Sequence, residues 1–221
     1  MTDSREHVVH RVATIPADGV GREVVETGRR IVDEVAKLSD GAFSVEWTEF
    51  PWGSDYYAEH GRMMPADGLD QLAGFDAIYF GAVGWPTVPD HISLWGLRLA
   101  ICQGLDQWPN VRPVVFHPGV TSPLRAADER ELDWVVVREN SEGEYAGIGG
   151  RNFSGRETGE VAVQSSVFTE AGCERIMRFA FDLARTRRRK KVTSVTKSNA
   201  QQYGMVLWDE VFRRVAEDYP D

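Results

Sequence analysis

The stretch Trp-Val-Val-Val-Arg-Glu-Asn-Ser-Glu-Gly-Glu-Tyr, residues 134 to 145, changes abruptly from apolar to polar. Its four apolar residues predict a short strand that is buried on both faces, as in a parallel sheet. Arg138 then lies at the carboxyl end of that strand, where parallel sheets bind their ligands. Its planar guanidinium group suits a carboxylate or a phosphate, and Tyr145 is a candidate proton donor. The stretch by itself is equally typical of a surface arginine that pairs with Glu139 or Glu142.

Two further segments place cationic side chains beside apolar, strand-like runs. Residues 108–116 contain Arg112, and residues 191–199 end with Lys197 and Asn199. Together with Arg138, these segments bring three cationic groups to the edges of predicted strands. The pattern predicts that the three groups converge on one anionic ligand.

The first half of the chain alternates predicted strands with predicted helices. Strand patterns cover residues 8–15, 43–48 and 77–80, and helical patterns cover residues 19–38, 54–60, 66–73 and 93–104. This alternation is typical of a parallel α/β sheet, and Asp18 is expected to cap the first helix. No Gly-x-Gly-x-x-Gly motif follows the first strand, so a nicotinamide cofactor would have to bind in another way.

The second half contains a polar segment that leaves the main sheet. Residues 143–168 are rich in Gly, Ser, Thr and Glu and end with alternating valines, which predicts an antiparallel arm. Thr169 is expected to cap the helix that follows. A last helix is expected over residues 201–217, with its apolar face in the core.

The composition describes an acidic globular protein of 221 residues with a formal net charge of -9. This charge argues against general nucleic-acid binding, and the basic residues 185–191 are expected to be a solvated helix C-terminus rather than a nucleic-acid patch. The two cysteines form no Cys-x-x-Cys pair, which favours a reducing cytoplasm. The sequence shows neither a signal peptide nor an apolar run of the ~20 residues that span a bilayer, so no membrane association is expected.

Four motifs stand in order along the chain. They are Ile-Pro-Ala-Asp-Gly-Val-Gly-Arg-Glu-Val at 15–24, Asn-Val-Arg-Pro at 110–113, Val-Arg-Glu-Asn-Ser-Glu-Gly-Glu-Tyr at 137–145 and Thr-Lys-Ser-Asn at 196–199. Together they resemble the β-decarboxylating dehydrogenases, the family of isocitrate and isopropylmalate dehydrogenases. Residues 83–86, 89–96 and 208–212 resemble the tartrate and D-malate dehydrogenase branch more than the isopropylmalate branch.

The resemblance implies a two-domain α/β fold of the isopropylmalate dehydrogenase type. Residues 1–99 would form an incomplete first domain, and residues 100–221 a second domain for substrate binding and dimerisation, with its arm at about 143–168. The implied reaction is the NAD-dependent oxidation, with or without decarboxylation, of a small 2-hydroxy diacid such as tartrate or D-malate. The implied partners are this dicarboxylate and a second copy of the chain.

The resemblance also implies roles for individual residues. Arg112 and Arg138 would hold the substrate carboxylates, and Tyr145 would protonate the enolate carbon. Lys197 would handle the hydroxyl proton in the site of the partner subunit, and Asn199 would contact the cofactor. A Mg²⁺ or Mn²⁺ ion would polarise the carbonyl group. The family's metal-binding aspartates lie beyond Asp221, so the sequence assigns no metal ligand.

The sequence departs from the family pattern in several ways. Cys102 stands where the family has another substrate arginine, and a thiol cannot make a bidentate contact with a carboxylate. Ala17 replaces a glycine in a loop, which is unfavourable if the loop requires a positive φ. The family continues well past Asp221, with the metal aspartates and the adenine loop of the NAD site.

The alternatives are a partial tartrate or D-malate dehydrogenase, an isopropylmalate dehydrogenase, and a non-catalytic truncated paralogue. In each case we expect no turnover by these 221 residues alone.

Overall fold

A computed structural model describes residues 7–115, 117, 119–121 and 132–221. The chain divides into two compact units, Met1–Leu105 and Asp106–Asp221. The boundary expected from the sequence, between residues 99 and 100, falls at the start of α5 (Leu99–Gly104), a helix of the first unit.

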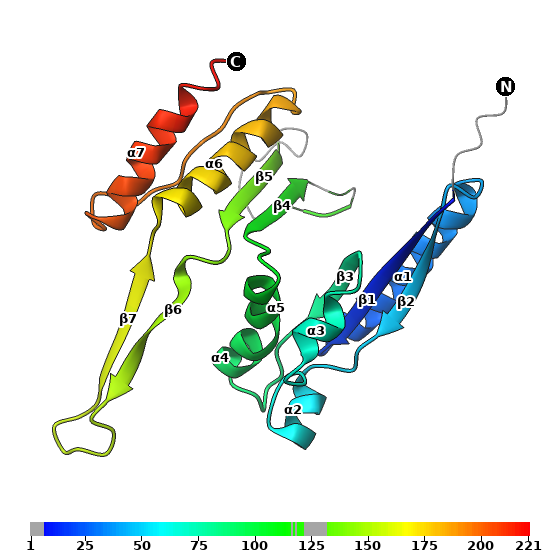
Figure 1. Ribbon diagram of the computed structural model, residues 1–221, viewed down its shortest axis with the longest axis horizontal. Helices are drawn as coiled ribbons and strands as arrows, with labels where there is room; N and C mark the ends of the chain where they lie inside the picture. Colours follow the sequence, from blue (N-terminus) through cyan, green and yellow to red (C-terminus); the bar gives the residue numbers. More distant parts are fainter. Residues whose placement is uncertain (1–6, 116, 118, 122–131) are drawn as a thin grey trace. The chain divides into compact units, whose positions relative to one another are not determined.

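The first unit is built on a parallel sheet of three strands with β1 at its centre (Figure 1). These strands are β1 (Val8–Ala17), β2 (Phe43–Glu49) and β3 (Ala77–Ala82). Helix α1 (Val20–Leu38) connects β1 to β2 and packs on the sheet. Helices α2 (Ser54–His60) and α3 (Gly68–Leu72) lie between β2 and β3 in the chain. The predicted parallel α/β arrangement is thereby confirmed, because β1 pairs in parallel with both neighbours.

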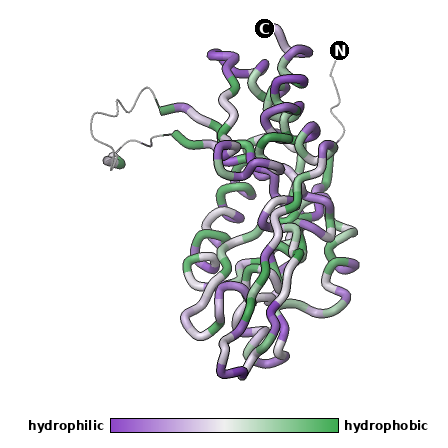
Figure 2. The backbone as a smooth tube through the Cα atoms, turned by 90° about the vertical axis from the view of Figure 1, so that its left-hand side faces the viewer, coloured by the Kyte–Doolittle hydropathy of each residue, from purple (hydrophilic) through white to green (hydrophobic). Residues whose placement is uncertain are grey.

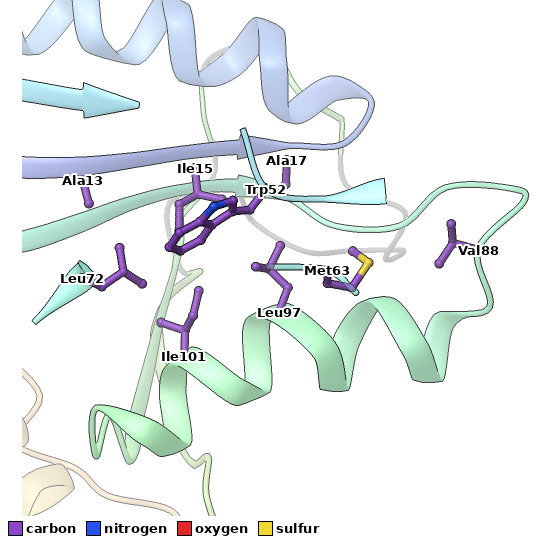
Figure 3. Close-up of a cluster of buried hydrophobic side chains, with 9 residues drawn as sticks. All are labelled: Ala13, Ile15, Ala17, Trp52, Met63, Leu72, Val88, Leu97 and Ile101. Carbon is purple, nitrogen blue, oxygen red and sulfur yellow. The ribbon is translucent and has the colours of Figure 1, made fainter. Parts of the chain in front are cut away.

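A continuous helical stretch packs against one face of this sheet. It consists of α4 (Asp90–Ser93), the π-helical turn η1 (Leu94–Arg98) and α5. Leu97 and Ile101 project from it towards the side chains of Ile15 and Trp52 (Figure 3). The buried apolar residues of this core are Ala13, Ile15, Ala17, Trp52, Met63, Leu72, Val88, Leu97 and Ile101.

Asp18 does not cap α1, contrary to the prediction. Gly19 occupies the capping position, and no side chain caps the helix. The Asp18 carboxylate is buried and accepts hydrogen bonds from Ser54 N and Ser54 Oγ, both at 2.8 Å, and from Gly84 N at 2.9 Å. The carboxylate thus accepts from two donors of Ser54, the first residue of α2, and from one donor in the segment after β3, and it does not bond to an N–H group of α1.

The second unit contains two separate antiparallel strand pairs and two helices (Figure 1). The elements are β4 (Pro109–Val115), β5 (Asp133–Glu139), β6 (Gly143–Asn152), β7 (Val161–Val167), α6 (Glu170–Arg185) and α7 (Gly204–Ala216). The two helices pack together around buried Ile176 and Val215, and Val137 of β5 packs against the same cluster. The hairpin of β6 and β7 forms the antiparallel segment expected within residues 143–168.

Two strand predictions in this unit are wrong. The segment around Trp134 was expected to be a parallel strand buried on both faces, but β5 pairs antiparallel with β4. Trp134 is 51% exposed and Val136 is 47% exposed, because only the face that carries Val137 packs against the helices. Residues 191–197 form no strand among the described residues. Hydrogen bonds to α7 hold this segment instead, from Trp208 Nε1 to Ser194 Oγ at 2.9 Å and from Thr196 Oγ1 to Met205 Sδ at 3.9 Å.

Helix α6 begins where the sequence predicts. Thr169 Oγ1 accepts a hydrogen bond from Gly172 N at 2.9 Å, so the predicted cap is confirmed. Beyond the end of this helix, Arg187 pairs with Asp133 at 2.6 Å and Lys190 pairs with Asp221 at 3.6 Å. These pairs use part of the basic run to tie the end of the helix to its own unit.

Hydrophobic and hydrophilic residues alternate over short distances along the chain (Figure 2). Within the described residues, no helix combines the length and the apolar character that a membrane span requires. Helices α6 and α7 each present an apolar face to their shared core.

Candidate functional site

Arg112 and Arg138 lie on the same face of the β4–β5 pair. Arg138 stands opposite Asn110 in the strand register, and Arg112 stands opposite Val136. Since alternate residues of a strand point to the same face, Asn110 and Arg112 share a face with Arg138. Val137, the neighbour of Arg138, points to the other face and packs against the helices. One face of this strand pair therefore contributes to the core, and the other presents both arginines.

A pair of amide side chains connects the two guanidinium groups. Arg112 Nε donates to Asn110 Oδ1 at 3.0 Å, and Asn110 Nδ2 donates to Asn140 Oδ1 at 3.1 Å. Asn140 Oδ1 also accepts from Arg138 Nη2 at 3.3 Å. The four side chains form one continuous hydrogen-bonded network, with a cationic group at each end. We call the Asn110–Asn140 pair the amide bridge.

Tyr145 lies against Arg138. The guanidinium carbon of Arg138 is 5.2 Å from the centroid of the Tyr145 ring, which is within the range of a cation–π interaction. The β6–β7 register is irregular between Gly143 and Ile148, and Tyr145 N donates to Glu142 O at 3.2 Å. This local turn at the start of β6 turns the phenol ring towards the arginine. The structure therefore brings Arg112, Arg138 and Tyr145 into one connected group.

The turn between β5 and β6 is held by two glutamates whose roles the sequence analysis missed. Glu139 accepts hydrogen bonds from Ser141 N at 2.9 Å, from Glu142 N at 2.6 Å and from Arg175 Nη2 at 3.2 Å. Glu142 accepts from Thr169 N at 2.9 Å and from Thr169 Oγ1 at 2.5 Å. The two carboxylates thus fasten the turn to the start of α6. The alternative of an ion pair between Arg138 and Glu139 or Glu142 is not seen among the described residues, where Arg138 donates to Asn140.

Lys197 and Asn199 are exposed in a turn that precedes α7. The carbonyl oxygen of Lys197 accepts from Ala200 N and from Gln201 N, both at 2.9 Å. Hydrogen bonds from the side chains of Ser198 and Thr196 hold the pKa of Asp209 on α7 below its usual value. The turn is thereby fixed to α7, but the hydrogen bonds of the described residues do not join Lys197 to either arginine.

The described residues do not fit the metal that the resemblance implies. Among residues 7–115, 117, 119–121 and 132–221, no three His, Cys, Asp or Glu side chains are grouped in a way that could hold a metal ion. The buried carboxylate of Asp18 already accepts three hydrogen bonds. For NAD, the only assigned contact is the exposed Asn199, and a single amide does not define a dinucleotide site. No reaction step is therefore derived through either group.

The chemistry of the group of Arg112, Arg138 and Tyr145 is that of anion binding beside a proton donor. Each guanidinium group can make charge-assisted hydrogen bonds to a carboxylate. Arg138 Nε is buried and has no hydrogen-bond partner, so this side chain carries unused donor capacity. Among the described residues, the hydrogen bonds that link the two cationic groups pass through neutral amides and not through a carboxylate, so these links do not neutralise either charge.

Comparisons with known proteins find relatives over nearly the whole chain. The family model for isocitrate/isopropylmalate dehydrogenase matches residues 11–221. The chain is 57% identical over 212 residues to a probable tartrate dehydrogenase/decarboxylase of Agrobacterium vitis, which covers 96% of this chain and 59% of the relative. It is 51% identical over 213 residues to the decarboxylating D-malate dehydrogenase of Escherichia coli K12, which covers 96% of this chain and 58% of that protein. The chain thus spans little more than half the length of these relatives.

The fold leads to the same family. The crystal structure of isocitrate dehydrogenase from Methylococcus capsulatus matches with a TM-score of 0.78 and 30% sequence identity, covering 96% of this chain and 58% of that one. The family resemblance, the similarity to tartrate and D-malate enzymes and the α/β fold type expected from the sequence are confirmed. The chain belongs to the isocitrate/isopropylmalate dehydrogenase family.

Proposed function

We propose that this chain supplies the substrate-binding and proton-transferring side chains of a dehydrogenase that oxidises a small 2-hydroxy diacid. Tartrate and D-malate are the proposed substrates, and NAD with Mg²⁺ or Mn²⁺ are the proposed cofactors. The similarity to tartrate and D-malate enzymes supports the substrate class. The observation that carries the proposal is the pair of arginines on one strand face, joined through Asn110 and Asn140.

The proposed roles follow from the chemistry of each side chain. Arg112 and Arg138 each bind one carboxylate of the diacid, since a guanidinium fork matches a carboxylate. Tyr145, stacked on Arg138, delivers a proton to the substrate carbon. Lys197 takes the proton of the substrate hydroxyl, and its exposed position suits a site that is completed by a second copy of the chain. Asn199 contributes to cofactor binding next to it.

Two alternatives keep specific support. A non-catalytic relative that retains carboxylate binding is favoured by Cys102, which stands where the family has an arginine. An isopropylmalate dehydrogenase is the other alternative, and affinity for an alkyl-substituted malate over D-malate would favour it.

The binding proposal is tested by removing the charge of Arg138. The Arg138→Gln substitution should weaken D-malate binding by about a hundredfold, because a hydrogen bond to a charged group contributes ~1.5–3 kcal/mol. Arg151→Gln is the matched control, since Arg151 is also a strand arginine, in β6, and pairs with Glu160. Calorimetric titration with D-malate measures the affinity of each variant of the 221-residue chain. Equal affinities in the two variants would contradict the proposed site.

A further inference from the structure

The amide bridge is anchored independently of the arginines that it joins. Asn140 is buried, with 2% of its surface exposed. Its backbone N–H donates to Trp108 O at 2.9 Å, and its Nδ2 donates to Gln107 O at 3.4 Å. Asn140 is therefore fixed to the segment that leads into β4, whatever the positions of Arg112 and Arg138.

The acceptor capacity of this buried amide is fully used. A carbonyl oxygen has two lone pairs, and Asn140 Oδ1 accepts one bond from Asn110 Nδ2 and one from Arg138 Nη2. Asn110 then offers its own Oδ1 to Arg112 Nε. Arg138 is thereby bound directly to Asn140 Oδ1, and Arg112 is linked to the same oxygen through Asn110, although like charges repel each other.

The neutral charge of the bridge is as important as its geometry. An aspartate at either position would form an ion pair with the adjacent arginine and compete with a carboxylate ligand. An asparagine accepts the same hydrogen bonds without neutralising the charge. The bridge thus orients two cations and leaves their charge to a ligand with two anionic groups.

We propose that Asn110 and Asn140 are positioning residues that set the spacing of Arg112 and Arg138, and that this spacing makes the site prefer ligands with two carboxylates over ligands with one. The inference rests on the proposed function and deepens it. A ligand with one carboxylate engages one guanidinium group and does not depend on the spacing. A dicarboxylate engages both groups and loses affinity as soon as the spacing is no longer fixed.

The Asn110→Ala substitution tests the bridge at its half-buried end. It removes the link between Arg112 and Asn140 and leaves both arginines in place. D-malate and D-lactate serve as probes, because both are 2-hydroxy acids but only D-malate has two carboxylates. Val111→Ala is the matched control, since Val111 is the next residue of β4 and points to the opposite strand face.

Calorimetric titrations of the 221-residue chain should separate the two probes. In Asn110→Ala we expect the Kd for D-malate to rise about tenfold, equivalent to ~1.4 kcal/mol. The Kd for D-lactate should stay within about twofold, so the preference for the diacid falls. Val111→Ala should change neither value. Circular dichroism verifies folding, and Asn110→Ser provides a second variant if Asn110→Ala does not fold.

The possible failures are distinguishable. An unchanged preference for D-malate in the folded Asn110 variant would overturn the amide bridge and leave the proposed function standing. An equal loss of preference in Val111→Ala would overturn it too, because the effect would then be one of general stability. If the unchanged chain binds D-malate no more tightly than D-lactate, the dicarboxylate site itself fails, and the bridge fails with it.

Discussion

Asp18 and Asn140 occupy similar positions in the two units but serve opposite purposes. Each directly follows a strand, and each is only 2% exposed. The carboxylate of Asp18 accepts three hydrogen bonds from Ser54 and Gly84 of its own unit, which ties the end of β1 to the segments that follow β2 and β3. The neutral amide of Asn140 accepts from Asn110 and from Arg138, which orients charged groups on an open strand face.

If the proposed function holds, the difference separates a buried polar residue with a structural role from one that positions binding groups. A buried carboxylate requires several hydrogen-bond donors. Asp18 obtains them from the backbone and hydroxyl groups of Ser54 and Gly84, so its oxygens are used within its own unit and not for a ligand. A buried amide needs less compensation and can be satisfied by side chains that lead outwards. The two residues are equally buried and differ in their hydrogen-bond partners, which is the basis for assigning only Asn140 to the proposed site.

The largest expected effect is on the stability of the first unit. Asp18→Ala should lower its free energy of unfolding by about 3 kcal/mol, because the N–H groups of Ser54 and Gly84 lose their acceptor. Denaturant titration of the variant provides the measurement. Asp55→Ala serves as the control, since its pair with Arg22 is exposed and should contribute less than about 1 kcal/mol. The affinity of the folded Asp18→Ala variant for D-malate should be unchanged. A loss of affinity would contradict the purely structural role that distinguishes Asp18 from Asn140.

A second prediction concerns the turn that carries Lys197. The pKa of Asp209 is lower in the folded chain than the usual aspartate value of 3.8. The ionised carboxylate therefore contributes its full stabilisation above pH 3.8, and this contribution is lost as the pH falls through the lower pKa of the folded chain. Stability should therefore decrease with acidification in this range, and less steeply in Asp209→Asn. Asp182→Asn on α6 is the control. An identical pH profile for Asp209→Asn and the unchanged chain, measured by urea unfolding at several pH values, would contradict the role of Asp209.

The smallest expected effect arises at the residue before Asp18. Ala17 has a φ of 56°, so the sequence-based concern about a glycine position is confirmed. Ala17→Gly should raise the free energy of unfolding by about 0.5–1 kcal/mol, since the left-handed conformation costs an L-residue ~1–2 kcal/mol and glycine's flexibility offsets part of the gain. Ala13→Gly, in the same strand but fully buried, should lower it instead. Thermal unfolding compares the two, and stabilisation by neither would mean that the loop imposes no strain.

The sequence predicted those parts of the fold that depend on local patterns. Periodicity and turn residues located α1, α2 and the strands of the first sheet, and Thr169 was identified as a cap because capping is a local interaction. Strand pairing was mistaken at β5, because the apolar run does not specify whether its neighbour lies parallel or antiparallel. Asp18 was misassigned because its donors lie 36 and 66 residues away in the chain.

In the candidate site too, the sequence identified some residues and missed those whose role depends on strand pairing. Charge beside strand-like runs identified Arg112 and Arg138 as candidates, and Tyr145 was identified as a proton donor close to Arg138 in the sequence. The structure connects the three. The amide bridge was missed, because an asparagine has no charge and its role depends on which residue stands across the strand pair. The register that places Asn110 opposite Arg138 is the signal that a correct antiparallel pairing would have given.

The central claim is that Arg112 and Arg138 bind one dicarboxylate together. Nuclear magnetic resonance of the arginine Nε–H groups tests it directly, with signals assigned from Arg112→Lys and Arg138→Lys variants. During titration with D-malate, both signals should shift and saturate at the same ligand concentration, while the Arg151 signal stays in place. A shift of only one signal, or saturation of the two at different concentrations, would contradict the claim.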